Sequence, residues 1–169
     1  GRVIFESDTS NVMFYDGSAW KYWGNSSNAR EFDGSDTTNT GTSTTTEVLL
    51  RSVTFTATQN RRYRIDVQAH TEYNAATNGS CALRVRWAAG ASVTTAGTQV
   101  REILAKLNAA GSTGRQVSDM VELDYTAATG QITVGVFGVS NDATQVNFDA
   151  STDSTDVGGT LIVRDWSAH

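Results

Sequence analysis

The feature that most constrains the fold of this chain is a repeated alternation of apolar and polar residues, which begins near Glu47 and continues almost to the end. In the segment 63–69, YRIDVQA, every second residue is apolar, and the segment 81–87, CALRVRW, shows much the same pattern. Successive side chains of a β-strand point to opposite faces, so each segment predicts a strand with one buried and one wet face. The sequence therefore predicts an antiparallel, all-β domain.

Similar segments follow one another along the chain, separated by turns rich in small polar residues. The segment 131–139 is apolar at both sets of alternating positions, which indicates a strand covered on both faces. A series of eight antiparallel strands is typical of a two-sheet sandwich, and of the jelly roll in particular. The eight expected strands are 48–57, 62–70, 81–88, 99–107, 116–125, 131–139, 144–149 and 160–166.

The segment 99–109 allows two interpretations. Its apolar residues match the helical spacing i, i+3, i+4, i+7, and Thr98 and Gly111 are suitable helix caps. However, alternate residues also form one apolar face, and both neighbouring segments resemble strands joined by Gly-rich turns. Because tertiary context often overrides local propensity, we predict a strand here. The helical alternative rests on Val100, Ile103, Leu104 and Leu107.

The N-terminal residues 1–24 predict a small β-meander. Asp16-Gly17, between the second and third of its apolar runs, is a strong hairpin signal because Gly accepts a positive φ. A sheet this small cannot bury its aromatic side chains by itself. We therefore expect it to pack on the main domain or on another chain. These aromatic residues are Trp20, Tyr22 and Trp23.

A polar segment, 25–46, separates the meander from the sandwich. Phe32 is its only large apolar residue, and Gly, Ser, Thr, Asn and Asp dominate it. This composition is typical of a linker. We therefore expect a meander for attachment or capping (1–24), a linker (25–46) and a jelly-roll sandwich (47–169).

Charge and composition disfavour several classes of function. The formal net charge is −5, whereas proteins that bind nucleic acid are usually basic, so we expect no nucleic-acid partner. No apolar run approaches the ~20 residues that cross a bilayer, so we expect no membrane insertion. The single cysteine, Cys81, has no partner for an intramolecular disulfide. Its place on an apolar strand face predicts a small buried hydrophobe.

The sequence offers no arrangement of residues suited to catalysis. Its two histidines, His70 and His169, lie in no recognisable nucleophile motif. We therefore expect no catalytic residues, no cofactor and no metal ion. A calcium site in an acidic loop is the alternative, although the spacing of its carboxylates does not fit an EF-hand. That loop contains Asp149, Asp153 and Asp156.

Two stretches resemble tail and fibre proteins of tailed bacteriophages. Residues 15–20, YDGSAW, are similar to a hairpin found in many phage minor tail and fibre proteins. Residues 158–166, GGTLIVRDW, are similar to the closing strand of phage jelly-roll modules. The middle of the chain is similar only in general form, and the sequence lacks the coiled-coil or collagen-like stalk that many fibres carry.

The resemblance implies a non-enzymatic virion protein: a tail fibre, a minor tail protein or a head fibre. Such a protein is made in the cytoplasm of the bacterial host and assembles with other virion proteins. The resemblance also implies a homotrimer with jelly-roll heads like those of the C1q and tumour necrosis factor families, and contact with a host cell-surface glycan. The alternatives are a carbohydrate-binding module of a larger enzyme and a capsid decoration protein.

Two sets of residues are candidates for contacts with partners. Aromatic and amide side chains suit a glycan or receptor, and the candidates are Trp20, Tyr22, Trp23, Tyr73, Asn74 and Asn78. The apolar strand 131–139 is the candidate for the subunit interface, because its burial against sibling copies would drive assembly. Its residues are Ile132, Val134, Val136, Phe137 and Val139.

An arginine cluster lies at the start of the segment 61–70. We expect Arg61, Arg62 and Arg64 to form cross-strand ion pairs, with Asp66 or with another subunit. Contact with an anionic glycan is the alternative.

Overall fold

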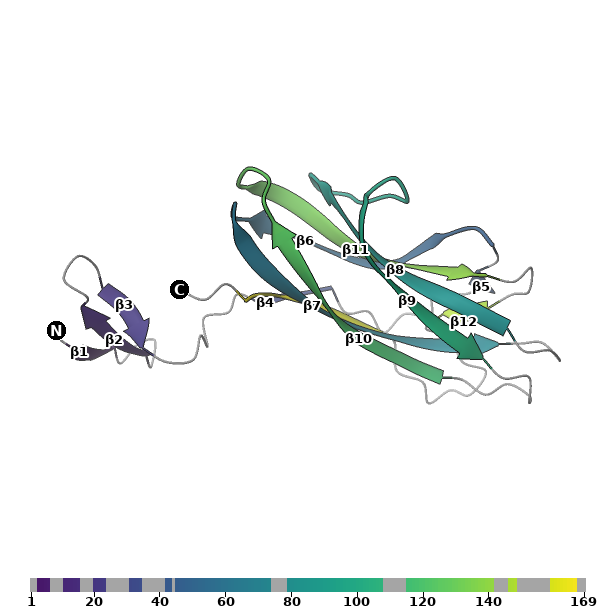
Figure 1. Cartoon of the computed structure of the whole chain (residues 1–169), viewed down its shortest axis with the longest axis horizontal. Coiled ribbons are helices and arrows are strands. Elements are labelled where there is room, and N and C mark those ends of the chain that lie inside the picture. Colours follow the sequence, from purple (N-terminus) through teal and green to yellow (C-terminus); the bar gives the residue numbers. More distant parts are fainter. Residues whose placement is uncertain are drawn as a thin grey trace.

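The computed structural model of the chain describes residues 3–6, 11–15, 20–23, 31–34, 42–43, 45–73, 79–107, 115–141, 146–148 and 159–166. These residues form strands, turns and bends, and none of them is helical. Figure 1 shows long, twisted strands that make up the body of the molecule. The predicted all-β class and jelly-roll sandwich are confirmed.

Two antiparallel sheets form the sandwich. The first has the strand order β6-β11-β8-β9. The second has the order β4-β13-β7-β12-β5, in which β4 is Glu31–Asp33 and β5 is Thr42–Ser43, and β10 pairs with the other side of β7. The main strands are β6 (Val48–Ala57), β7 (Arg61–Tyr73), β8 (Gly79–Ala89), β9 (Thr98–Leu107), β10 (Arg115–Tyr125), β11 (Gly130–Ser140), β12 (Val146–Phe148) and β13 (Thr160–Asp165).

Each of the eight strands expected from alternation is present, including the ambiguous segment 99–109, which contains β9. This strand pairs along its length with β8, from Gly79 opposite Leu107 to Trp87 opposite Thr98. A helix at this place would leave one edge of β8 without that ladder of hydrogen bonds. The non-local pairing therefore decides against the helical spacing of the apolar residues.

The core lies between the two sheets and contains a row of aromatic rings. Phe32 stacks on Phe55 at 4.3 Å between ring centroids, and Phe55 lies 5.2 Å from Tyr63. Tyr125 follows, with its ring centroid 6.5 Å from that of Tyr63 and 5.3 Å from that of Trp87. These contacts join β4, β6, β7, β10 and β8, so strands distant in sequence meet in one packed interior.

Two short strands form within the segment 25–46, which the sequence predicts as a linker. β4 (Glu31–Asp33) pairs with β13, and β5 (Thr42–Ser43) pairs with β12. Strand pairing uses backbone N–H and C=O groups, so a polar segment can take part without an apolar pattern. The paired sheet therefore begins before residue 47, and Phe32 packs against the core.

The N-terminal segment forms the expected meander. β1 (Val3–Glu6), β2 (Asn11–Tyr15) and β3 (Trp20–Trp23) make an antiparallel sheet with the order β1-β2-β3. Tyr15 pairs with Trp20, so Asp16-Gly17 falls in the connection between two paired strands. The side chains of this sheet lie outside the described residues, and its packing on the main domain or on another chain stays a prediction.

Candidate binding face

The outward side of the second sheet carries a dense set of polar side chains, and we call it the β7 face. Residues of β7 with odd numbers, from Tyr63 to Ala69, are buried, so the alternating even residues point outward. Strand register places the outward residues of β10 and β13 beside them. The face comprises Arg62, Arg64, Asp66 and Gln68 of β7, Ser118, Met120, Glu122 and Asp124 of β10, and Thr160, Ile162, Arg164 and the following Trp166.

Ion pairs connect the arginines of this region to carboxylates of neighbouring strands. Arg62 Nε donates a hydrogen bond to Asp124 Oδ1 at 2.8 Å, and Arg61 Nη1 lies 3.5 Å from Asp165 Oδ2. The hydrogen bond to Asp124 raises the pKa of the Arg62 guanidinium above its ordinary value. These contacts hold the guanidinium groups in place at the end of the sheet.

A second group of charges lies further along the β7 face. Arg64 Nε donates to Asp66 Oδ1 at 2.8 Å, and Arg164 of β13 donates to the other oxygen of the same carboxylate. Asp66 is thus a partner of the arginine cluster, as predicted, but Arg64 reaches it from the same strand, and the cross-strand contact to Asp66 comes from Arg164 instead. One carboxylate joins two strands and fixes the position of Arg64.

Trp166 stands at the end of β13, beside this charged group. Its backbone N–H donates to the carbonyl oxygen of Arg62 at 2.8 Å, which continues the ladder between β13 and β7. The Arg64 Cζ atom lies 5.6 Å from the centre of the Trp166 ring, a cation–π contact that orients the indole. The residue is nevertheless 53% exposed, so a large apolar surface stays in contact with solvent.

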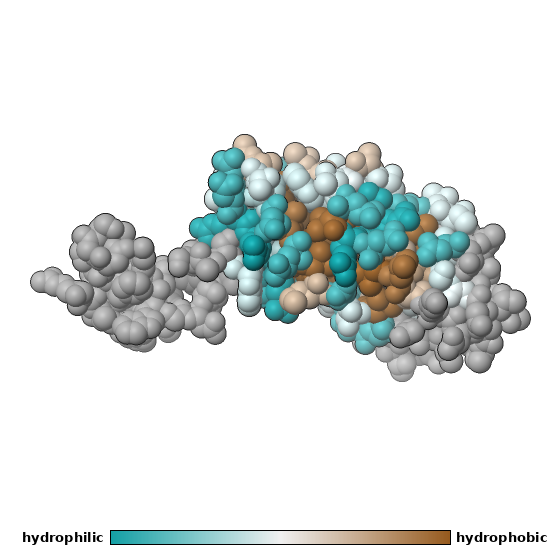
Figure 2. Space-filling model, viewed as in Figure 1, coloured by the Kyte–Doolittle hydropathy of each residue, from teal (hydrophilic) through white to brown (hydrophobic). Residues whose placement is uncertain are grey.

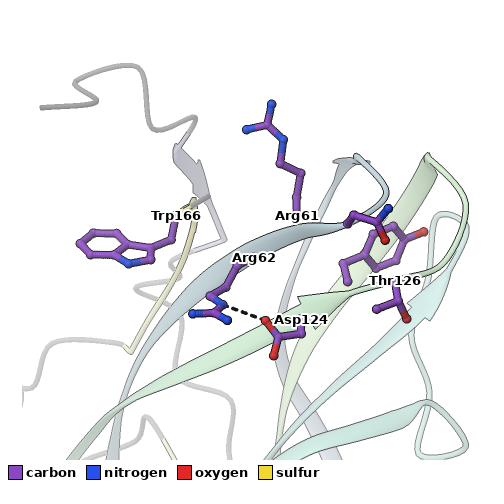
Figure 3. Close-up of a pocket in the computed structure, with 7 residues that line it drawn as sticks. Arg61, Arg62, Asp124, Thr126 and Trp166 are labelled. Atoms are coloured by element: carbon purple, nitrogen blue, oxygen red, sulfur yellow. Dashed lines mark hydrogen bonds and ion pairs between the residues drawn. The ribbon is translucent and has the colours of Figure 1, made fainter. Parts of the chain in front are cut away.

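A hollow of about 640 Å³ lies at this end of the face, and Figure 3 shows its lining. Arg62 and Asp124 meet in the middle of the view, with Trp166 on one side of them and Thr126 on the other. The turn between β6 and β7 contributes Asn60, whose φ of 61° lies in the left-handed region that Asn tolerates. The lining residues are Asn60, Arg61, Arg62, Asp124, Tyr125, Thr126 and Trp166.

A second, smaller hollow of about 400 Å³ lies further along the same strands. Met120, which is 51% exposed, supplies its apolar contact. Hydroxyl, amide and carboxylate groups surround it. Its lining residues are Asp66, Val67, Gln68, Ser118, Asp119, Met120 and Thr160.

A separate charged network lies on the outer side of the first sheet. Glu47 accepts hydrogen bonds from Arg86 Nε at 2.7 Å and from Arg84 Nη1 at 2.9 Å, and Arg84 Nε donates to Glu102 at 2.7 Å. Burial acts to raise the pKa of Glu47, but the hydrogen bonds and charges of Arg86 and Arg84 together outweigh it and lower that pKa. The network joins the residue before β6 to β8 and β9, which is a structural role.

The glycan or receptor candidates from the sequence are not among the described residues that line these hollows. Trp20, Tyr22 and Trp23 lie on β3, and their side chains are outside the described residues. Tyr73 ends β7 and its side chain is likewise not described, while Asn74 and Asn78 are outside the described residues altogether. The contacts predicted for these six residues remain predictions.

The residues predicted for the subunit interface are buried within this chain. Ile132, Val134 and Val136 belong to the core between the sheets. Phe137 and Val139 are 2% and 5% exposed. Burial of β11 on both faces thus agrees with its sequence pattern.

The cover on the outward side of β11 comes from the chain itself. A Cβ added at Gly135 would lie 2.6 Å from Val93 Cγ1 and 3.0 Å from Leu49 Cδ1, so these two side chains lie directly over the strand. A second copy would therefore have to contact other residues than the five predicted.

The described residues that could take part in catalysis or metal binding are either buried or scattered over the fold. Cys81 is fully buried, as predicted for a small hydrophobe. Within the described ranges, no three His, Cys, Asp or Glu side chains are grouped so that they could hold a metal ion. The calcium alternative at Asp149, Asp153 and Asp156 falls outside those ranges. The described part of the chain also contains no helix of the length and apolarity that a bilayer crossing requires.

Of the residues that line the first hollow, the sequence patterns pointed only to Arg61 and Arg62, and Trp166 is the most prominent of those that they missed. In the segment 160–166, TLIVRDW, the outward positions are Thr160, Ile162 and Arg164, and the same period continues to Trp166. A large aromatic residue on a predicted wet face is a signal that could have identified it. Its neighbours Arg62 and Asp124 belong to other strands, and no local pattern connects them.

Comparisons with known proteins give likeness of fold without likeness of sequence. No protein-family model matches the chain, and no curated protein matches it. Among solved structures, a chain of the infectious bursal disease virus particle aligns with a TM-score of 0.51 and 10% identity, over 90% of this chain and 39% of that chain. This chain thus spans about two-fifths of the virus protein.

Two further structures are similar at lower scores. The VP2 protein of infectious bursal disease virus, in derived particles, aligns with a TM-score of 0.46 and 10% identity over 90% of this chain and 40% of that one. A carbohydrate-binding module of family 4 aligns with a TM-score of 0.34 and 13% identity over 66% of this chain and 59% of that one. The likeness to known proteins therefore rests on the virus-particle chain with the TM-score of 0.51, and at 10% identity that likeness is one of fold alone.

Proposed function

We propose that this chain is a non-enzymatic structural component of a bacteriophage virion, in a tail fibre, minor tail protein or head fibre, and that it assembles as a homotrimer. The observation that carries the proposal is the combination of a YDGSAW hairpin with a jelly-roll sandwich. The hairpin resembles phage tail and fibre proteins, and the sandwich is a fold from which a virus particle is also built. Its partners in this role are other virion proteins and the host cell surface.

The edge formed by β9 supports assembly into an oligomer. β9 ends the first sheet, so one side of its backbone has no strand partner among the described residues, and Leu104 on it is 66% exposed. Val100 and Ile103 are only partly buried against the core. In the view of Figure 2, hydrophobic surface lies among hydrophilic residues in the middle of the sandwich, where β9 and β10 run side by side. An exposed apolar edge of this kind favours contact with another chain.

Light scattering coupled to size-exclusion chromatography tests the proposed assembly. We expect the mass of three chains for the wild type, and a lower mass for Leu104→Arg, because a charge at the β9 edge opposes burial there. The far-UV spectrum of the variant should be unchanged, since the side chain is already exposed. Val48→Arg is the matched control, because Val48 is also exposed but lies on β6 at the opposite edge of the first sheet, and this variant should keep the trimeric mass. A wild-type chain that stays monomeric at all concentrations would contradict the proposal.

The location of the chain within the virion needs a separate experiment. Labelling of particles with an antibody against the chain, viewed by electron microscopy, should mark a fibre or the tail. Labelling over the whole capsid surface would instead support a capsid decoration protein.

The exposed Trp166 beside an open hollow favours a second candidate function, a carbohydrate-binding module of a larger enzyme. This candidate predicts a monomer that binds soluble polysaccharide. Oligomeric state therefore discriminates between the two candidates, because the virion role requires the trimer and the module does not.

A further inference from the structure

We propose that the β7 face binds a neutral glycan chain, with the Trp166 indole as the stacking platform and the hollow beside it as the first sugar site. The proposal assigns a ligand-binding site and its ligand class, which goes beyond the assembly role. It holds for either candidate function, because both place a glycan on the exterior of the sandwich.

The first step from the structure to a glycan site is the position of Trp166, which allows a sugar ring to stack on its indole. The apolar faces of a sugar ring stack on aromatic side chains, which present a large flat area at little cost in conformational entropy. Trp166 is 53% exposed, and its backbone hydrogen bond to Arg62 and cation–π contact with Arg64 hold it in one orientation. A fixed, exposed indole at the rim of a hollow is a preorganised platform.

The second step is the hydrogen-bonding chemistry of the hollow. Arg62, Asp124 and Asn60 line it with planar groups that carry several donors or acceptors each. Two neighbouring hydroxyl groups of a sugar ring can both hydrogen-bond to one such planar group, because each hydroxyl can donate to a carboxylate or accept from a guanidinium or an amide. The Arg62–Asp124 hydrogen bond holds two of these groups in place before a ligand arrives.

The third step is charge, which separates neutral from acidic glycans. Each arginine of this region lies close to a carboxylate: Arg62 to Asp124, Arg61 to Asp165, and Arg64 and Arg164 to Asp66. Glu122 adds a further negative charge that acts on Arg62. Carboxylates therefore balance the arginines, and the face offers no surplus of positive charge to an acidic ligand.

The fourth step is the length of the face. The second hollow, with the exposed Met120, lies on the same three strands as the first. Arg62 and Gln68 are six positions apart on β7, which corresponds to about 20 Å along a strand. A shallow surface of this length suits several units of a chain, bound end to end, better than one compact small molecule.

The indole N–H signals of the ¹⁵N-labelled full chain, recorded by NMR, test the proposal. The Trp166 signal is identified by its absence in Trp166→Ala. Neutral gluco-, galacto- and manno-oligosaccharides of four to six units are the probes, and oligogalacturonate is the acidic comparison. We expect at least one neutral probe to shift the Trp166 signal in a saturable manner, with an affinity that added salt does not change.

Variants assign the binding to this face. Trp166→Ala should weaken binding by about tenfold or more through the loss of one stacking platform, and Trp166→Tyr should restore part of it. For these variants, binding is measured by calorimetry with the probe identified by NMR. Val48→Ala, at an exposed apolar residue on β6 of the first sheet, is the matched control and should bind as the wild type does.

Three results would overturn the proposal. The first is that no neutral probe shifts the Trp166 signal. The second is that only the acidic probe binds and that salt abolishes the binding. The third is that Trp166→Ala lowers the mass in light scattering, which would assign the face to contact with a second copy. The proposed trimer is judged separately, from the wild-type mass and the Leu104→Arg variant, so either proposal can fail alone.

Discussion

Glu47 shows how a single residue before the first long strand connects the start of that strand, β6, to β8. Its side chain is 11% exposed and lies within hydrogen-bonding distance of Arg84 and Arg86, both on β8. Hydrogen bonds to a charged group contribute about 1.5–3 kcal/mol each when they are largely shielded from water. The residue therefore fixes the start of β6 against the outer side of β8.

The lowered pKa of Glu47 makes its contribution depend on pH. A carboxyl group whose pKa is lower in the folded than in the unfolded chain stabilises the fold above the unfolded value, here near 4.5, and loses this effect as the pH falls through the folded value. We expect Glu47→Gln to lower the free energy of unfolding by about 2 kcal/mol at pH 7. The difference from wild type should vanish in acid, as measured by urea unfolding across that range.

Glu102→Gln is the control for this prediction. Glu102 is 35% exposed and accepts a hydrogen bond from Arg84 but not from Arg86. Its replacement should therefore lower the free energy of unfolding by at most about 1 kcal/mol. Equal effects of the two variants at pH 7 would contradict the role given to Glu47.

Strand β11 shows at the scale of one element what close packing demands of the backbone. It runs through the middle of the first sheet with both faces covered, and a Cβ added at Gly138 would lie 2.8 Å from the ring of Phe148. Phe148 is fully buried. Glycine is required here because the ring occupies the space of a side chain.

We therefore expect Gly138→Ala to destabilise the fold by about 1–3 kcal/mol through overpacking. Gly130→Ala, at the other end of the same strand, is the matched control, because its added Cβ would meet no atom closer than 3.8 Å. Thermal unfolding should show a lower midpoint for Gly138→Ala only. A midpoint that falls equally in both variants would indicate a general effect of glycine replacement in β11.

The whole molecule joins a short N-terminal sheet to a sandwich whose paired strands begin within the polar segment 25–46. β1, β2 and β3 pair only with one another among the described strands, whereas β4 and β5 pair with β13 and β12 of the sandwich. Two truncations separate these contributions.

A chain that starts at residue 25 should keep the unfolding midpoint of the sandwich, because every paired strand of the sandwich remains. A chain that starts at residue 47 should unfold at a lower temperature, because it lacks β4 and β5 and the stacking of Phe32 on Phe55. Differential scanning calorimetry of both chains measures this. Equal midpoints for the two would show that the polar segment is a linker, as its composition predicts.

Local alternation along the chain determined the fold class and the eight long strands. It also predicted the burial of Cys81 and the two covered faces of β11, because side-chain period and burial are properties of one strand at a time. Composition did not indicate β4 and β5, because their pairing uses backbone groups, which do not depend on an apolar pattern. The apolar pattern of β11 likewise did not reveal what covers its outward side, which Val93 and Leu49 of the same chain supply.

Only the tertiary structure decided which outward residues become neighbours. Trp166 follows the end of β13, Arg62 lies near the start of β7 and Asp124 lies near the end of β10. They meet because both outer strands pair with β7 in antiparallel register. Register between strands depends on the whole set of strands that share a core, and a one-residue shift would turn these side chains to the other face. The sequence therefore specified each strand and its solvent-exposed side, while the pairing of distant strands created the β7 face.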